Sequence, residues 1–509
     1  MKHDKVKIAR LLTHLDLGSS VAEEDTLLES ARVETSAFSE LWLDKVDLVP
    51  GTKGSGKSAL YRIFVDYLAD SLLENRKVVI AHGVQRHGDP VFHAYKTEFE
   101  QLDEEDFVAF WCIYLISLAH EHFVKDERYR EYLAECSDEV ARFRALCSRA
   151  HIPEIDAPRS LKQILAWGLA VLAHWRPKVT WKLPKEAGEI GLDLFGQPFE
   201  SQDLKEIDTY LPTYMTPIKE WLQEILRKSN LSLWLMIDKL DEIFPRRSDV
   251  ERRGLRGLLR VMRVLNCPEI RLKIFLRDDI LEQIVAGGEG FTALTHITAR
   301  QADKLTWSED QILTMVVKRI FGNKPLREYL GVDQERLDAS PTYQREAFYQ
   351  VFPDKVFRGA NQSPTHRWIY NHTADGKGVV TPRDVIDLLT AAKRWQQNEC
   401  MADASGRAEW IISPAAIRHG LKQLSIRKRT TYLQAEFPHL WPHIEKFVGG
   451  KTEYSESAIK RLLGKNWEAI CEDLAAVGVM SRFAGGNGCS FKFPFVYRAG
   501  LELTHRRVD

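Results

Sequence analysis

Residues 51–58 read Gly-Thr-Lys-Gly-Ser-Gly-Lys-Ser and match the pattern G-x-x-x-x-G-K-S of a phosphate-binding P-loop. The glycines let successive backbone N–H groups surround a β-phosphate. Lys57 reaches the β- and γ-phosphate oxygens, and the Ser58 hydroxyl ligates Mg²⁺. We therefore predict that this loop binds ATP and Mg²⁺ as cofactors. Its predicted binding residues are Gly51, Thr52, Lys53, Gly54, Ser55, Gly56, Lys57 and Ser58.

The sequence on either side of the loop supports this prediction. Residues 46–49 form a short apolar run typical of a strand, and residues 57–73 carry apolar side chains at helical spacing. A loop between a strand and a helix N-terminus places phosphate where the helix dipole favours negative charge.

Further apolar runs predict strands at 77–82, 231–237 and 271–276, with helical stretches between them. This alternation predicts an α/β fold with a parallel sheet covered by helices on both faces. Residues 98–228 are far more than one crossover needs and predict a helical insertion. Within it we expect helices at 107–123 and 161–174 and a hairpin at 181–195.

The composition is that of a globular protein with more than one domain, since 44% of the 509 residues are hydrophobic and 28% are charged. The apolar run 107–119 is too short to cross a bilayer and is expected to be a buried helix. Seven cysteines without a C-x-x-C pair, and no signal peptide, predict a cytoplasmic protein with no membrane partner. His82, His87 and His93 match no common zinc spacing.

The strand at 231–237 ends in Asp238-Lys239-Leu240-Asp241-Glu242. Triphosphate hydrolysis needs one acid for the magnesium shell and another that orients or deprotonates water. Asp238 is predicted to take the first role. For the second we favour Asp241 and keep Glu242 as the alternative, because Lys239 occupies the next position.

Arg277 ends the next strand and is predicted to lie beside the γ-phosphate as a sensor 1 residue, the alternative being a surface ion-pair network. The region after Glu242 carries an arginine stripe on a helix. The stripe would supply an arginine finger, contact nucleic-acid phosphates or form a solvated face. Its members are Arg252, Arg253, Arg256, Arg260 and Arg263.

The C-terminal part differs in character from the rest. Residues 308–321 predict a helix with a capping box formed by Ser308 and Gln311, and residues 300–400 are expected to be all helical. Beyond them, predicted helices are followed by strands at 479–483 and 490–493 around a glycine-rich turn, which predicts a winged helix. The predicted helices are 439–448, 455–463 and 467–477.

Several motifs together resemble bacterial P-loop ATPases of the origin-recognition-like branch of AAA+ proteins. Beside the P-loop and the Asp238 element, these motifs are Leu17-Gly-Ser-Ser-Val-Ala-Glu23, Phe275-Leu-Arg-Asp-Asp279, Leu305-Thr-Trp307 and Thr381-Pro-Arg-Asp384. The Asp-x-Leu-Asp-Glu form is also similar to the STAND and NACHT signalling ATPases. The resemblance spans nearly the whole chain.

The resemblance implies an ATP-dependent switch with an αβα core, a helical lid and a C-terminal winged helix. It implies that Arg383 is a sensor 2 residue in the lid. Lys239 departs from the pattern, which implies hydrolysis that is slow or partner-dependent. By association only, it places the chain in phage defence or mobile-element biology. The domains expected are a lead-in at 1–43, a core at 44–300, a lid at 301–404 and a winged helix at 405–509.

Two functions remain open. In the first, the switch binds duplex DNA through its C-terminal part, because residues 410–509 contain 15 Lys and Arg and only 9 Asp and Glu. The contacts would come from Lys460, Arg461 and Lys465 on a helix and Arg482 and Lys492 on the wing. In the second, a STAND-like scaffold assembles with itself or with an effector protein, without DNA. An ABC signature and the Asn-Lys-x-Asp motif of GTPases are both absent from the sequence, which favours ATP.

Overall fold

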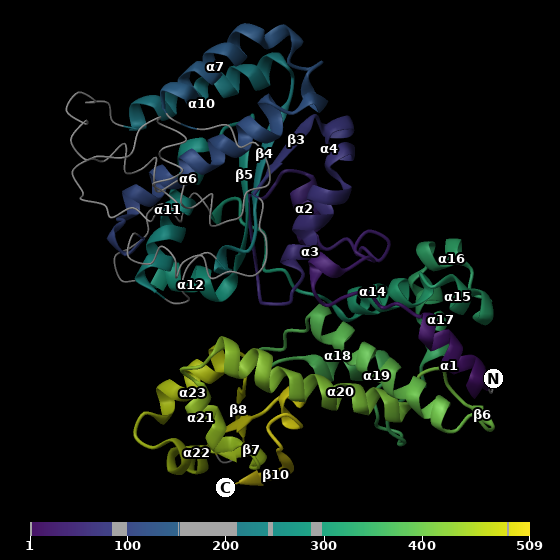
Figure 1. Cartoon of the computed structure of the whole chain (residues 1–509). Helices are drawn as coiled ribbons and strands as arrows, with labels where there is room; N and C mark the ends of the chain where they lie inside the picture. Colours follow the sequence, from purple (N-terminus) through teal and green to yellow (C-terminus); the bar gives the residue numbers. More distant parts are fainter. Residues whose placement is uncertain are drawn as a thin grey trace. The chain divides into compact units, whose positions relative to one another are not determined.

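The computed structural model describes residues 3–83, 99–150, 152, 211–242, 248–286, 298–485 and 488–508. The chain divides into two compact units. Unit 1 comprises Met1–Thr35, Gly54–Gly56 and Thr306–Asp509, and unit 2 comprises Ser36–Lys53 and Lys57–Leu305. Figure 1 shows both units and labels many of their helices and strands.

Unit 2 is built on a parallel sheet in which the strand order is β2-β5-β4-β3. The strands are β2 (Leu48–Gly51), β3 (Val78–His82), β4 (Ser232–Ile237) and β5 (Ile270–Arg277). Each lies where an apolar run of the sequence predicted it. The prediction of a mixed α/β fold with a parallel sheet is confirmed.

Alternate residues of each strand enter two separate cores. Leu233 and Leu235 of β4 belong to one hydrophobic cluster, while Trp234 and Met236 belong to another. Helices therefore cover both faces of the sheet, as Figure 1 shows. The first face packs against α6 (Glu104–Ala119), α10 (Leu211–Lys228), α11 (Asp249–Leu265) and α12 (Asp278–Ala286), and α7 (Ser137–Arg149) packs on α10. The second packs against α2 (Ser36–Trp42), α3 (Lys57–Arg62) and α4 (Ala69–Arg76).

The helix predicted over 57–73 is interrupted. α3 gives way to a π-helical turn at Ile63–Tyr67, where the Leu68 N–H donates to the Ile63 carbonyl at 3.0 Å. A π-helical turn contains one more residue than an α-helical turn, and the spacing of apolar side chains does not predict it. It accompanies the burial of Phe64, whose ring lies 5.3 Å from that of Phe38 between centroids.

A buried lysine ties β5 to the residues before β2. The Lys273 side chain is 0% exposed, and its ammonium donates to the Asp47 carboxylate and to the Val46 carbonyl, both at 2.7 Å. It also pairs with Asp44 and lies 4.7 Å from the centre of the Trp234 ring. These partners replace the water that a buried ammonium would otherwise need.

Helix α6 is the apolar helix expected in the insertion. It begins at a capping box formed by Asp103 and Asp106, and its Trp111 indole N–H donates to the Gly254 carbonyl at 2.8 Å. By length and composition the segment Glu104–Val124 could span a membrane, but 78% of its apolar 18-residue window is buried inside the structure. The predicted helix at 161–174 and hairpin at 181–195 lie outside the described residues.

Unit 1 has one continuous hydrophobic core. Helix α14 begins at the capping box predicted for Ser308 and Gln311, and helices follow through residue 400 as expected. A buried ion pair between Arg319 and Asp25, at 2.6 Å, anchors the N-terminal segment to α14. The helices are α1 (Lys5–His14), α14 (Glu309–Phe321), α15 (Lys324–Leu330), α16 (Gln334–Ala339), α17 (Pro341–Val351), α18 (Thr365–Thr373), α19 (Pro382–Ala402) and α20 (Pro414–Lys428).

The C-terminal part of unit 1 contains the expected helices and hairpin, with two strands that the sequence did not predict. Its sheet has the order β10-β7-β9-β8, in which β7 and β10 pair in parallel. β7 was missed because its five residues are polar and adjoin a helix. The elements are α21 (Trp441–Ile444), β7 (Lys451–Ser455), α22 (Glu456–Leu463), α23 (Trp467–Ala476), β8 (Ser481–Gly485), β9 (Gly488–Lys492), α24 (Phe495–Arg498) and β10 (Thr504–Val508).

Two histidines of unit 2 make its stability sensitive to acid. The rings of His82 and His122 lie 4.5 Å apart between centroids, and burial lowers the pKa of both, that of His122 to about 4. An unfolded histidine titrates near pH ~6.5. The unfolded chain therefore binds protons that folded His122 does not, and the free energy of unfolding falls as the pH drops from about 6.5 toward 4.

We expect the free energy of unfolding of His122→Gln to fall by roughly 2 kcal/mol less than that of the wild type when the pH drops from neutral to about 4. Urea unfolding across that pH range checks the effect, with the exposed His14→Gln as the matched control. An equal pH dependence in the two variants would contradict it.

Candidate functional site

The P-loop connects β2 to α3 as the sequence predicted. Lys57 is buried, and its ammonium donates to the carbonyls of Gly51 at 2.8 Å and Thr52 at 2.9 Å. Burial lowers the pKa of Lys57 to about 8, against the opposing influence of Asp238 and Asp241. The lysine therefore spans its own loop, close to the acids at the end of β4.

Asp238 follows the last residue of β4 and is buried at 5% exposure. The Ser58 side chain lies close enough to the Asp238 carboxylate to favour its charged form, so the two predicted magnesium ligands are neighbours. Burial raises the pKa of Asp238 to about 6, while the Ser58 side chain and the charge of Lys57 act in the opposite direction. Two oxygen donors side by side suit Mg²⁺, which takes few protein ligands and keeps water or phosphate for the rest.

Arg277 brings the neighbouring strand into the same site. In the register of the sheet it lies opposite Gly51, the first P-loop residue. Its guanidinium pairs with Asp241 at 3.3 Å and with Asp279 at 2.8 Å, and it is 8% exposed. Arg277 therefore lies beside the P-loop, and its side chain is buried rather than exposed on the surface.

The structure thus brings together Lys57, Ser58, Asp238, Asp241 and Arg277. Of the two candidates for the second acid, Asp241 lies in the short 3-10 turn Leu240–Glu242 and meets Arg277. The Glu242 side chain lies outside the described part of the chain. Lys239 adopts a left-handed backbone conformation, with φ of 58°, at the bend between Asp238 and that turn.

The loop itself has features that suit a phosphate. Gly54 and Gly56 have φ of 85° and 99°, which L side chains rarely adopt. The hydroxyls of Thr52 and Ser55 are buried and have no hydrogen-bond partner among the described residues. Polar atoms buried in this way favour a ligand that would satisfy them. Lys53 is partly exposed.

The tip of the loop, Gly54–Gly56, belongs to unit 1 and contacts residues there. A Cβ on Gly54 would lie 3.2 Å from Cβ of Arg383 and 3.3 Å from the Thr381 hydroxyl. Arg383 lies in the first turn of α19, and its Nε donates to the Ser20 carbonyl at 3.2 Å. The predicted sensor 2 residue therefore lies against the loop tip and the N-terminal segment.

Sequence reasoning gave no role to Trp307, although it quoted the motif that contains it. The Trp307 indole N–H donates to the Ser55 carbonyl at 2.7 Å. The only sequence signal was an aromatic residue just before a helix cap, which does not indicate a partner more than two hundred residues away. Asp279 was also not assigned, although an acid two residues after Arg277 could have suggested its ion pair.

Three of the five arginines in the α11 stripe contact residues at the start of α6 or just before it, inside unit 2. Arg256 pairs with Glu104 at 2.8 Å and is buried, and Arg260 pairs with Glu104 at 3.1 Å and with Glu105 at 2.5 Å. Arg253 donates to the Leu102 carbonyl at 2.5 Å. The expectation of a solvated face is wrong for these positions, because the acidic N-terminus of α6 lies against them.

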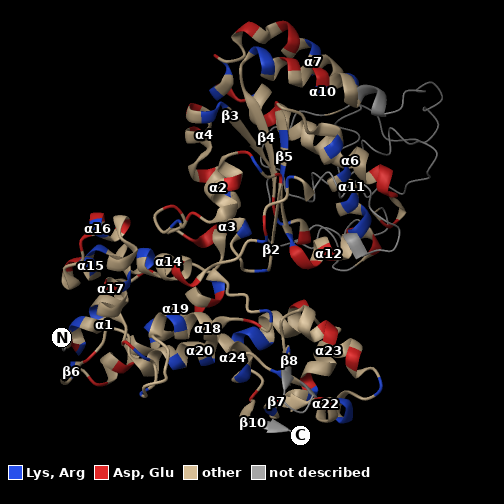
Figure 2. Ribbon diagram, turned by 180° about the vertical axis from the view of Figure 1, so that it is seen from behind, with Lys and Arg blue, Asp and Glu red and all other residues tan. Residues whose placement is uncertain are grey.

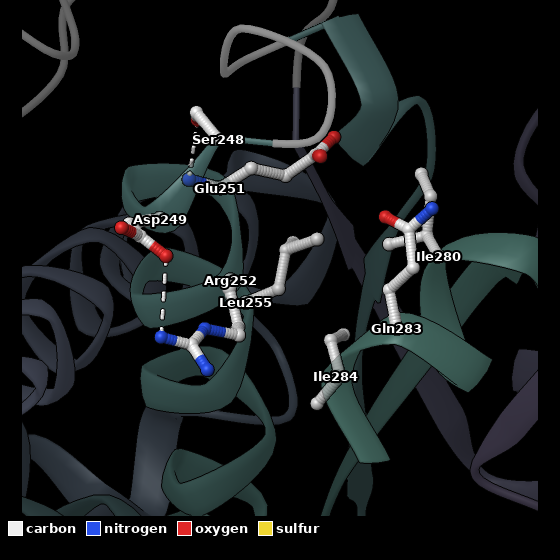
Figure 3. Close-up of a pocket in the computed structure, with 8 residues that line it drawn as sticks. All are labelled: Ser248, Asp249, Glu251, Arg252, Leu255, Ile280, Gln283 and Ile284. Carbon is white, nitrogen blue, oxygen red and sulfur yellow. Dashed lines mark hydrogen bonds and ion pairs between the residues drawn. The ribbon is translucent and has the colours of Figure 1, made fainter. Parts of the chain in front are cut away.

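A separate pocket of about 270 Å³ lies between α11 and α12 (Figure 3). It contains none of the residues predicted to bind nucleotide. Its lining residues are Ser248, Asp249, Glu251, Arg252, Leu255, Ile280, Gln283 and Ile284. Among the residues that the structure describes, no cluster of three His, Cys, Asp or Glu could hold a metal, and His87 and His93 lie outside them.

The basic residues predicted to contact nucleic acid lie on α22, its following turn and the hairpin. Lys460 pairs with Glu456 at 2.7 Å, and Lys492 pairs with Glu453 at 3.0 Å. Lys465, Arg461 and Arg482 are exposed. Figure 2 shows basic positions on α22 and acidic positions on α23, which carries Glu468, Glu472 and Asp473 and no Lys or Arg.

Comparisons with known proteins add little to this geometry. No protein-family model matches the chain, and no curated protein matches it. Among solved structures the chain is similar to the ORC2 protein of Aeropyrum pernix in ADPNP-ADP complexes, at 13% identity and a TM-score of 0.38. The match covers 91% of this chain and 90% of that one. At this level of similarity it carries no argument about function.

The contacts of Gly54 yield a test of the loop tip. We expect Gly54→Ala to weaken ATP binding about tenfold or more, because the new Cβ adds backbone strain of roughly 1–2 kcal/mol and presses on Arg383. Isothermal titration with ATP checks this. Gly331→Ala is the matched control, since Gly331 has φ of 65° and no atom within 4 Å of the added Cβ. Equal affinity in both variants would contradict the expectation.

Proposed function

We propose that this protein is an ATP-binding and ATP-hydrolysing AAA+-like switch. The observation that carries the proposal is the meeting of Lys57, Ser58, Asp238 and Arg277 at the carboxyl edge of the unit 2 sheet. In open α/β sheets ligands bind at this edge, outside the carboxyl ends of the strands.

The residues have distinct roles in this proposal. Lys57 exchanges its loop carbonyls for phosphate oxygens, and the loop N–H groups hold the β-phosphate. Ser58 and Asp238 hold Mg²⁺, which when bound offsets the charge that develops on the phosphates. Asp241 orients the attacking water, and Arg277 fixes the Asp241 carboxylate through their ion pair. Arg383 serves as the lid residue that responds to the nucleotide.

The acid that orients water follows Asp238 by three positions rather than one, with Lys239 between them. In this structure the Asp241 carboxylate is engaged by Arg277. To act on water it must keep one oxygen accessible or loosen this pair. We therefore propose slow basal hydrolysis that a partner accelerates.

Lys57→Ala and Asp241→Ala separate binding from hydrolysis. We expect Lys57→Ala to lower ATP affinity at least about tenfold, because a buried charge-assisted contact to phosphate is lost. Asp241→Ala should bind ATP and reduce turnover about a hundredfold, because positioning of the water is lost. Filter binding and phosphate release measure the two effects. Turnover in purified Lys57→Ala equal to that of the wild type would contradict the proposal.

We further propose that the C-terminal part of unit 1 contacts duplex DNA through phosphates as a winged helix. Support comes from the net positive charge of residues 410–509, which contain 15 Lys and Arg and 9 Asp and Glu, and from exposed Lys465, Arg461 and Arg482. Helix α23 argues for a limited contact, because its acidic residues would repel phosphate.

That acidic helix supports the second candidate, a STAND-like scaffold. In a winged helix the third helix usually enters the major groove. By order along the chain this would be α23, whose Glu468, Glu472 and Asp473 suit a basic protein partner better. In this alternative the ATP state controls assembly with itself or an effector, and either function is compatible with a role in phage defence.

One experiment separates the two candidates. We expect the double variant Lys460→Glu, Arg461→Glu to weaken duplex DNA binding about tenfold at low salt and to reduce the salt dependence. Lys422→Glu, exposed on α20, is the matched control. Equal DNA binding by both variants would reject contact through Lys460 and Arg461. Absence of DNA binding by the wild type at low salt, together with an ATP-dependent change in size by light scattering, would reject DNA contact in favour of the scaffold.

A further inference from the structure

We propose that Trp307 is a positioning residue that sets the Ser55–Gly56 peptide so that the Gly56 N–H faces the phosphates. The inference rests on the triphosphate binding proposed above. It gives the orientation of a P-loop peptide to a side chain that lies outside the P-loop. Trp307 and Gly54–Gly56 all belong to unit 1.

The geometry of the peptide gives the direction. The Trp307 indole N–H donates to the Ser55 carbonyl at 2.7 Å, and the described chain contains no cis peptide bond. In a planar trans peptide the C=O and the following N–H point in opposite directions. The Gly56 N–H therefore points away from Trp307, which leaves it available to a phosphate oxygen.

The peptide needs such a restraint because of its glycine. Gly56 has φ of 99°, and glycine populates several backbone conformations at little cost. A rotated peptide would present the Ser55 carbonyl, instead of the Gly56 N–H, to a phosphate, and the two would repel each other. The bond to Trp307 favours the productive orientation before the nucleotide arrives.

Trp307 is itself held in place. The Tyr370 hydroxyl of α18 donates to the Trp307 carbonyl at 2.9 Å. The next residue, Ser308, is the N-cap of α14 and forms a capping box with Gln311, which fixes the backbone just after Trp307. The ring also covers Gly56, since its nearest atom would lie 3.7 Å from a Cβ at that position.

Trp307→Phe tests the inference, because it keeps an aromatic ring and removes only the N–H donor. We expect an affinity for ATP about threefold to tenfold weaker, the effect of losing one hydrogen bond. The wild-type tryptophan fluorescence should change on ATP addition, and this change should be lost in Trp307→Phe. It should persist in the control Trp395→Phe, because Trp395 lies in α19 and its ring packs on His419 of α20.

The outcomes separate this inference from the proposed function. If Lys57→Ala weakens binding while Trp307→Phe binds ATP and responds in fluorescence like the wild type, only the role of Trp307 is overturned. If Lys57→Ala binds ATP as well as the wild type, both fail. Should Trp307→Phe not fold, Tyr370→Phe replaces it. This variant should weaken affinity in the same direction, and wild-type affinity in it would overturn the inference.

Discussion

The candidate site depends on one buried ion pair, between Lys273 of β5 and Asp47 just before β2. The pair links the two strands at residues that precede the register match of Gly51 with Arg277. A slip of one residue would turn every side chain of β5 to the other face and move Arg277 away from the P-loop. Breaking a buried pair of this kind typically costs about 3–5 kcal/mol. The ion pair thus fixes the register at one end of the two strands, and this register places Arg277 beside the P-loop at the other end.

At that other end, burial disfavours the charges of two site residues. Burial lowers the pKa of Lys57 and raises that of Asp238, so each group is held in an environment that disfavours its charge. A metal ion beside Asp238 and a polyanion beside Lys57 would relieve both at once. The short turn after Lys239 returns Asp241 toward the sheet, where Arg277 meets it. The site therefore combines contributions from three neighbouring strands.

Local patterns predicted the parallel sheet and the strand and helix on either side of residues 51–58, because strand alternation, helix spacing and caps such as Ser308 with Gln311 are encoded over a few residues. They failed where the cause is distant. A solvated face was one alternative for the arginine stripe of α11, but Glu104, more than a hundred residues earlier, pairs with Arg256 and Arg260. Trp307 looked like one aromatic residue among many, since its partner is the Ser55 carbonyl. The residues next to a side chain in the sequence do not indicate whether it has a partner far along the chain.

The seam between the helices of unit 1 and its C-terminal sheet has a consequence for how this protein can be divided. The Gly376 N–H donates to the Gly478 carbonyl at 2.7 Å, Lys377 donates to the Ala476 carbonyl at 3.0 Å, and one apolar core runs from Ile8 to Leu501. A cut after α19 would open that core to water. The C-terminal segment therefore does not fold as a separate domain. A recombination event that replaced it would also have to replace the loop before α19 to keep these contacts.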